Sequence, residues 1–179
     1  MKIGTVEIPN HFVLAPLAGI NCTAFRILCK ENGAGLLYTQ MIDAELISRK
    51  TRKETAQFLN IQNSEHPVTV QLIGSEKNVL VKAVQAVEEF ADIIDLNIGC
   101  IEEDYLQKGC GSRLLKDLPR LEMLLRAMVD ATKKPVSAKV RIGWDNQHNN
   151  GVAVAQLVEN TGASVLCVHG RTADQAYAG

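Results

Sequence analysis

Short apolar runs alternate with amphipathic stretches along almost the entire chain, and this alternation constrains the fold more than any other feature of the sequence. The runs are nearly continuous in apolar residues, as expected of parallel strands that are covered on both faces. They comprise residues 12–15, 35–39, 68–72, 93–97, 136–141 and 165–169. The pattern therefore predicts an α/β fold built from repeated strand–helix units.

The stretches between these runs have the apolar spacing and the end signals of helices. One helix is expected after Ser75, which can cap it, and another after Asp117, with a proline in its first turn. Two more are expected at residues 22–31 and 151–160, each ending close to a glycine. We expect the leading residues 2–8 to form a small hairpin that plugs the bottom of the sheet.

Six consecutive units of about thirty residues each favour a (β/α)8 TIM barrel over an open doubly wound sheet. An open sheet would usually carry a glycine-rich fingerprint after its first strand, whereas here that strand leads into APLAG at residues 15–19. A proline at this place suits a backbone that lies against a flat ring. Since a complete barrel needs about 250 residues, the chain predicts a single domain over residues 1–179 that stops before strands seven and eight.

The composition indicates neither a nucleic-acid surface nor a membrane surface over the chain as a whole. The 19 basic and 20 acidic residues give a net charge of −1, and no stretch has the pattern of a signal peptide or a membrane span. The five cysteines form no CxxC pair, which argues against a metal site or a disulfide framework and favours a cytoplasmic setting. A basic run at residues 49–53 is typical of a solvated helix face, with RNA binding as the alternative.

Polar side chains stand at the carboxyl ends of successive predicted strands, where barrel enzymes build their sites. These ends carry Pro16, Gln71, Asn97 with Cys100, Lys139 with Arg141, and His169 with Arg171. Each residue alone has a structural explanation, since free cysteines, for example, are often buried in cores. Lys139 is harder to explain in this way, because an ammonium group in a barrel mouth is costly unless it meets an anion or an electron-rich ring. Their shared position favours a catalytic site.

Seven motifs occur in an order that resembles the tRNA-dihydrouridine synthase family, flavin enzymes with a barrel catalytic domain. They are APLAG (15–19), AFRILCKENGAGLLYTQM (24–41), QLIG (71–74), DLNIGC (95–100), GCGSRLL (109–115), KVRIGW (139–144) and HGRTADQAYAG (169–179). The resemblance covers essentially the whole chain, and the combination is much more specific than any one motif.

The resemblance implies FMN as the cofactor, NADPH as the reductant and tRNA as the partner. It also implies that a C-terminal helical domain outside these residues binds the tRNA. It implies that FMN is held by Pro16, Leu17, Ala18, Gln71, Lys139 and His169. It implies that the target uracil is held by Asn97, Arg141 and Arg171. Cys100 would be the general acid that gives a proton to C5 of uracil while a hydride reaches C6, since a free thiol with a pKa of about 8.5 is mostly protonated at neutral pH.

The chain departs from the family pattern beside the proposed acid. Ile101 follows Cys100 where the family usually has proline, and Asp104 stands where it usually has lysine. Acidic residues near RNA phosphates are unfavourable, so these departures bear on substrate choice and efficiency more than on the fold. Because strands seven and eight hold the flavin phosphate in the family, we expect the 179 residues by themselves to bind FMN weakly and to lack turnover.

Two other functions fit the same residues. A flavin dehydrogenase that acts on free pyrimidines or on dihydroorotate would use similar chemistry, with a cysteine or serine opposite the flavin. A barrel fragment that has lost its flavin site would instead serve as a binding module, and its full-length product would be colourless.

Overall fold

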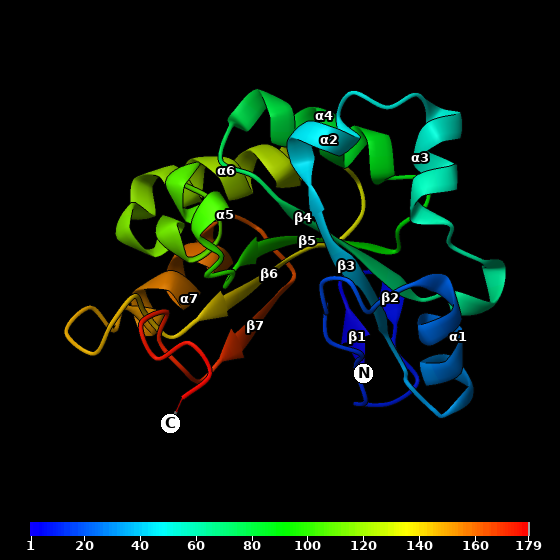
Figure 1. Ribbon diagram of the computed structural model, residues 1–179, viewed down its shortest axis with the longest axis horizontal. Helices are drawn as coiled ribbons and strands as arrows, with labels where there is room; N and C mark the ends of the chain where they lie inside the picture. Colours follow the sequence, from blue (N-terminus) through cyan, green and yellow to red (C-terminus); the bar gives the residue numbers. More distant parts are fainter. Residues whose placement is uncertain (179) are drawn as a thin grey trace.

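The computed structural model describes residues 1–178 and has a parallel five-stranded sheet at its centre (Figure 1). The strands lie side by side in chain order: β3 (Leu37–Asp43), β4 (Val68–Ile73), β5 (Ile93–Ile98), β6 (Val136–Arg141) and β7 (Val165–His169). Every pair of neighbours is parallel, so all the carboxyl ends lie at the same edge of the sheet. This order brings the polar residues that follow the strands to one place.

Helices connect successive strands and cover one face of the sheet (Figure 1). The α-helices are α1 (Thr23–Glu31), α2 (Ala44–Ile47), α3 (Arg52–Leu59), α4 (Lys77–Val87), α5 (Glu103–Gln107), α6 (Leu118–Asp130) and α7 (Gly151–Asn160). Two short 3₁₀ helices, η1 (Asn63–Glu65) and η2 (Gly111–Lys116), lie in the connections. Helix α6 follows Asp117 as predicted, and Asp117 caps it, because its carboxylate accepts a hydrogen bond from the backbone N–H of Arg120.

The main core lies between the sheet and the helices, since each long helix turns an apolar stripe inward. Its fully buried helical members are Ala44 and Ile47 from α2, Leu80, Ala83, Val84 and Val87 from α4, Leu121, Leu124, Leu125 and Met128 from α6, and Val154 from α7. These residues pack against the outward-facing apolar side chains of β4, β5 and β6. Burial of this apolar surface is the main stabilising contribution to the fold.

The leading residues form the predicted hairpin, with β1 (Lys2–Ile3) paired antiparallel to β2 (Val6–Glu7). Ile3 and Ile8 belong to a second buried cluster, together with Leu36, Tyr38 and Ile93. Leu36 and Ile93 stand at the amino ends of β3 and β5, so the hairpin covers the end of the sheet opposite the polar residues.

Parallel strands in sequential order, with helices on the outer face and a hairpin beneath, make a partial TIM-barrel-like fold. The predicted α/β class and the incomplete barrel are therefore confirmed. Among residues 1–178, no helix has both the length and the apolar character needed to cross a membrane.

The predicted first strand, residues 12–15, was wrong: the segment makes only one parallel bridge, between Val13 and Leu36. Its backbone pairing stops there because Pro16 has no N–H to donate. The side chain of Asn21 takes over instead, since its Nδ2 donates to the carbonyl oxygens of both Ala15 and Tyr38, at 2.8 Å each. A side-chain amide thus links this segment to β3 where a ladder would otherwise continue.

The predicted cap of α4 was also wrong. Ser75 precedes the helix by two residues, and its hydroxyl donates to the carbonyl oxygen of Lys108 at 2.6 Å. Glu76 stands at the cap position without a side-chain hydrogen bond to the helix. Ser75 therefore joins the loop after β4 to the loop that contains Lys108, and does not begin a helix.

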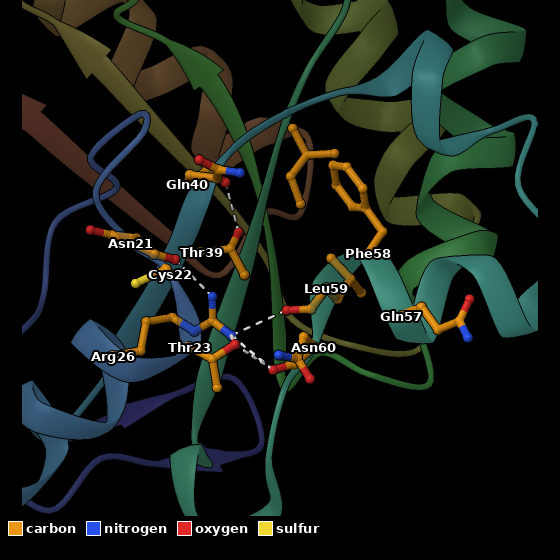
Figure 2. Close-up of a pocket in the computed structure, with 11 residues that line it drawn as sticks. Asn21, Cys22, Thr23, Arg26, Thr39, Gln40, Gln57, Phe58, Leu59 and Asn60 are labelled. Atoms are coloured by element: carbon orange, nitrogen blue, oxygen red, sulfur yellow. Dashed lines mark hydrogen bonds between the residues drawn. The ribbon is translucent and has the colours of Figure 1, made fainter.

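A buried ion pair ties α1 to the segment before β4. Arg26 and Glu65, whose side chains are 3% and 0% exposed, contact each other through the Arg26 Nε and the Glu65 carboxylate. The guanidinium also donates to the carbonyl oxygens of Asn21, Leu59 and Asn60, at 2.8, 3.2 and 3.3 Å (Figure 2). This arrangement satisfies the buried charge on every side, which is the condition for tolerating it in a protein interior.

Candidate active site

A cavity of about 440 Å³ lies at the carboxyl ends of the strands. Most of the site residues proposed from the sequence line it: Pro16, Leu17, Ala18, Asn97, Cys100, Lys139, Arg141 and His169. The first three belong to the loop before α1, and the others follow or end β5, β6 and β7. The size is within the usual range for small-molecule sites, about 300–1,000 Å³.

The loop that carries Cys100 is held by a side chain from the end of β5. The Oδ1 of Asn97 accepts hydrogen bonds from the backbone N–H of Gly99, at 3.0 Å, and of Cys100, at 2.8 Å. The carbonyl oxygen of Cys100 in turn accepts from the N–H of Ser112 at 2.9 Å. The thiol is thus placed by contacts on both sides of its own backbone.

Gly111 packs directly against this loop. A Cβ atom at Gly111 would lie 2.7 Å from the carbonyl oxygen of Cys100 and 3.0 Å from its Cβ, both closer than van der Waals contact allows. The φ of Gly111 is +60°, in the left-handed region that favours glycine. Both features require glycine at this position.

Burial raises the pKa of the half-buried Cys100 thiol above its ordinary value. Hydrogen bonds from the backbone at Glu102 and Ile101 and the nearby Arg141 guanidinium act in the opposite direction, but they do not outweigh burial. The group is therefore a protonated thiol at neutral pH, which suits a proton donor and not a nucleophile.

The cavity is also lined by cationic side chains. Lys139 and Arg141 lie on β6, and His169 ends the neighbouring strand β7. Partial burial, together with the charges of Arg141, Lys139 and Arg171, lowers the pKa of His169, so its imidazole is neutral at neutral pH. The fixed positive charges at the cavity are therefore those of the lysine and arginine side chains.

Arg141 also joins two loops. Its Nε donates to the carbonyl oxygen of Gly99 at 2.9 Å, and its Nη1 donates to those of Thr172, at 2.9 Å, and Ala176, at 2.8 Å. These bonds connect the loop after β5 to the loop after β7 on either side of β6. The predicted contact of Arg141 with a uracil stays a prediction, since much of its guanidinium serves this structural link.

Two residues proposed from the sequence do not line the cavity. Gln71 is fully buried beneath it: its Nε2 donates to Asp95 Oδ2 at 2.7 Å, and its Oε1 accepts from Asn97 Nδ2 at 2.8 Å. Arg171 follows β7 and is outside the cavity lining within the described part of the chain. The roles predicted for them, in holding FMN and uracil, stay predictions.

Six residues that line the cavity were not proposed from the sequence: Ala15, Ile20, Met41, Gly99, Glu102 and Tyr177. Met41 turns inward because a bulge shifts the register of β3 between Tyr38 and Met41. The ring of Tyr177 lies 5.8 Å from the guanidinium carbon of Arg141. Met41 and Tyr177 lie within the motifs quoted above, which was the available signal for both.

Asp95 was also missed, although it is a carboxylate inside an otherwise apolar strand. It is fully buried, and burial raises its pKa from 3.8 to about 6, against the opposing effects of Ser137, Gln71, Lys139 and Tyr38. A carboxyl group with a raised pKa holds its proton more tightly in the folded protein than in the unfolded chain. Its favourable contribution is therefore complete below the unfolded pKa and is lost as the pH rises through about 6.

We expect Asp95→Asn, which does not titrate, to expose this pH dependence. The free energy of unfolding of the wild-type chain, relative to the variant, should fall by about 2 kcal/mol between pH 4 and pH 8, because each pKa unit corresponds to about 1.4 kcal/mol and the unfolded carboxyl group is already partly ionised at pH 4. Urea unfolding of both proteins across this range measures the difference. A difference that does not change with pH would contradict the expected shift.

The basic run at residues 49–53 stands apart from the cavity, and none of its residues lines it. Arg49 pairs with Glu45 one helical turn away, and Arg52 pairs with Glu89 at 2.6 Å. Within residues 1–178, no group of three or more His, Cys, Asp or Glu side chains is arranged to hold a metal ion.

A comparison with known protein families gives a match over almost the whole chain. The family model described as dihydrouridine synthase (Dus) matches residues 13–179. The chain belongs to the dihydrouridine synthase family. The whole chain aligns with tRNA-dihydrouridine synthase B of Pseudomonas aeruginosa at 38% identity, and with a probable tRNA-dihydrouridine synthase of Rickettsia bellii at 36%.

The alignments cover 100% of this chain but only 54% of the Pseudomonas relative and 55% of the Rickettsia relative, so the chain spans about half the length of the curated relatives it matches. Among solved structures, 2,3-dimethylmalate lyase superposes with a TM-score of 0.58 over 88% of this chain and 56% of that enzyme. The sequence identity is 16%, so this likeness concerns the fold alone.

Proposed function

We propose that this dihydrouridine synthase family member is the catalytic part of a cytoplasmic enzyme that uses FMN and NADPH to reduce the C5–C6 bond of uridine in tRNA. The observation that carries the proposal is the placement of Cys100 and Lys139 around one cavity, a protonated thiol on one loop and an ammonium group on the adjacent strand. Family membership supports it, since relatives that align over this whole chain are named tRNA-dihydrouridine synthases.

The residues around the cavity fit a flavin. Pro16, Leu17 and Ala18 form an apolar wall against which a flat ring can lie. Lys139 and Arg141 supply positive charge at the same cavity, which suits a ring that becomes electron-rich on reduction. We propose that the apolar wall backs the ring and that Lys139 and His169 contact it; reduced FMN, once bound, would supply the hydride.

Cys100 then has one task, to deliver a proton to C5 of uracil. Its raised pKa keeps the proton on sulfur until a carbanion-like centre develops beside it, and a donor held by Asn97 and Ser112 loses little entropy in reaching that centre. After transfer the thiolate lies near the Arg141 guanidinium, whose charge stabilises it. Bulk water returns the proton after the product leaves.

The target base has to leave its stack to enter such a cavity. We propose that Asn97, Arg141 and Arg171 contribute to holding it, and that the part of the relatives beyond the aligned segment contributes to binding the tRNA. Alone, the 179 residues are expected to bind FMN weakly and to lack turnover.

A chimera tests this function directly. Residues 1–179 would replace the aligned half of the Pseudomonas aeruginosa relative, and the purified protein would be assayed for flavin absorption and for NADPH-dependent dihydrouridine formation in unmodified tRNA. We expect a yellow protein that modifies tRNA and leaves free uridine, uracil and orotate-type substrates unchanged. Preference for free pyrimidines would support the small-substrate alternative, and a colourless protein would support a binding module; either would overturn the proposal.

A further inference from the structure

We propose that Asp95 is a positioning residue: its buried carboxylate sets, through Gln71 and Asn97, the orientation of the loop that carries Cys100. The inference rests on the proposed function only where Cys100 is given a role in proton transfer. The positioning itself follows from hydrogen bonds within residues 69–137 and can be tested without any flavin.

The carboxylate of Asp95 lies at the start of a chain of polar contacts. Its Oδ1 accepts from the hydroxyl of Ser137 at 2.5 Å, and its Oδ2 accepts from Nε2 of Gln71 at 2.7 Å. Because all three residues are 0–1% exposed, no solvent can substitute for a missing partner. Such a carboxylate is tolerated only when its oxygens are hydrogen-bonded.

The charge of this carboxylate fixes the orientation of the side-chain amides of Gln71 and Asn97. An ionised carboxylate only accepts, so Gln71 has to present its NH₂ group to Asp95 and its carbonyl oxygen to the other side. That oxygen accepts from Nδ2 of Asn97 at 2.8 Å, which fixes the Asn97 amide in turn. The Oδ1 of Asn97 is thereby directed at the N–H groups of Gly99 and Cys100.

Loss of the charge removes this constraint. A protonated Asp95 can donate as well as accept, so Gln71 becomes free to turn its amide around. If Gln71 alone turns, its NH₂ group faces the NH₂ group of Asn97, and the hydrogen bond between the two side chains is lost. If Asn97 turns as well, its NH₂ group faces the N–H groups of Gly99 and Cys100. Either state loses hydrogen bonds that hold the loop of Cys100, and each buried hydrogen bond that is lost lowers the stability of the loop.

Other charged or titratable groups also face this series of hydrogen-bonded side chains. Tyr38 of β3 and Lys139 of β6 face Asp95 directly, and Cys167 of β7 faces Tyr38. Lys139 favours the ionised carboxylate, so one ammonium group acts on the cavity above and on the carboxylate below. Tyr38 has a pKa raised well above its ordinary value, mainly by burial, and stays neutral across the range in which Asp95 titrates.

Hydrogen exchange of individual backbone amides tests the proposal in the 179-residue chain. The protection of the Gly99 and Cys100 amides, corrected for intrinsic exchange, should fall at least about tenfold as the pH drops from 7.5 to 5, since losing about 1.4 kcal/mol of stabilisation is a tenfold change. The amide of Glu88, bonded to Val84 in α4, should show no such step. In Asp95→Asn the step should disappear.

Gln71→Met breaks both side-chain contacts of Gln71 while keeping the Asp95 side chain and most of the side-chain volume at position 71. It should lower the protection of the Gly99 and Cys100 amides at pH 7.5 at least about tenfold. Ser112→Ala is the matched control, because the buried Ser112 hydroxyl has no hydrogen-bond partner within residues 1–178, although the Ser112 backbone N–H bonds Cys100. This control should leave the protection unchanged.

Three results would overturn the positioning role: no step in the wild-type profile, the same step in Asp95→Asn, or unaltered protection in Gln71→Met. The wild-type profile needs no variant, so the test survives a variant that does not fold. The chimera assay decides the proposed function separately, because the exchange measurements involve neither FMN nor tRNA.

Discussion

Replacing Cys100 by alanine in the chimera is expected to abolish dihydrouridine formation while leaving the reduction of bound flavin by NADPH close to the wild-type rate. General acid catalysis by a positioned group contributes about 10²- to 10⁴-fold, so the single-turnover rate of uridine reduction should fall by a factor in that range. The flavin half-reaction involves no proton transfer to uracil and should be spared. Stopped-flow absorption measures the two half-reactions separately.

Cys110→Ala is the matched control for this experiment. Cys110 belongs to the same loop system and is also a free thiol, but it is 5% exposed and does not line the cavity. Its replacement should leave both half-reactions close to those of the wild type. Equal loss of both half-reactions in Cys100→Ala would instead mean that the thiol has a structural role.

Replacing Glu65 by glutamine is expected to destabilise the fold by about 3–5 kcal/mol, because it leaves the guanidinium of Arg26 buried without its counter-charge. Both side chains are almost completely shielded from solvent, so water cannot compensate for the lost carboxylate. The contact joins α1 to η1, which are far apart in the sequence. Urea unfolding of the 179-residue chain at pH 7 measures the loss.

An exposed ion pair on the same protein provides the control. Arg52 and Glu89 make a 2.6 Å contact, but their side chains are 79% and 43% exposed. Glu89→Gln should therefore change the free energy of unfolding by less than about 1 kcal/mol. Similar losses in Glu65→Gln and Glu89→Gln would show that burial of the Arg26 pair contributes nothing to its effect.

The parallel strands and the longer helices could be predicted because their signals are local. Apolar runs mark β4 to β6, and Asp117 with the following proline marks the start of α6. The segment at residues 12–15 was misread because its pairing is decided by Asn21, whose amide links two carbonyl oxygens far apart in sequence. Ser75 was misread for a similar reason, since its partner is Lys108.

The candidate site was predictable to the extent that it depends on strand order. Residues after β5, β6 and β7 had to meet once those strands were parallel neighbours, and Cys100, Lys139 and His169 do line one cavity. The depth of Gln71 and the contacts of Asp95 were not predictable in this way. They depend on which side chain meets which across the sheet, and a sequence pattern gives only the face of a strand.

The contact between Gly111 and Cys100 has a consequence for engineering. The two positions behave as a single steric unit, so the thiol-bearing turn can be exchanged with that of a relative only if position 111 stays glycine. Mutant libraries that vary the residues of the cavity should therefore keep glycine at position 111.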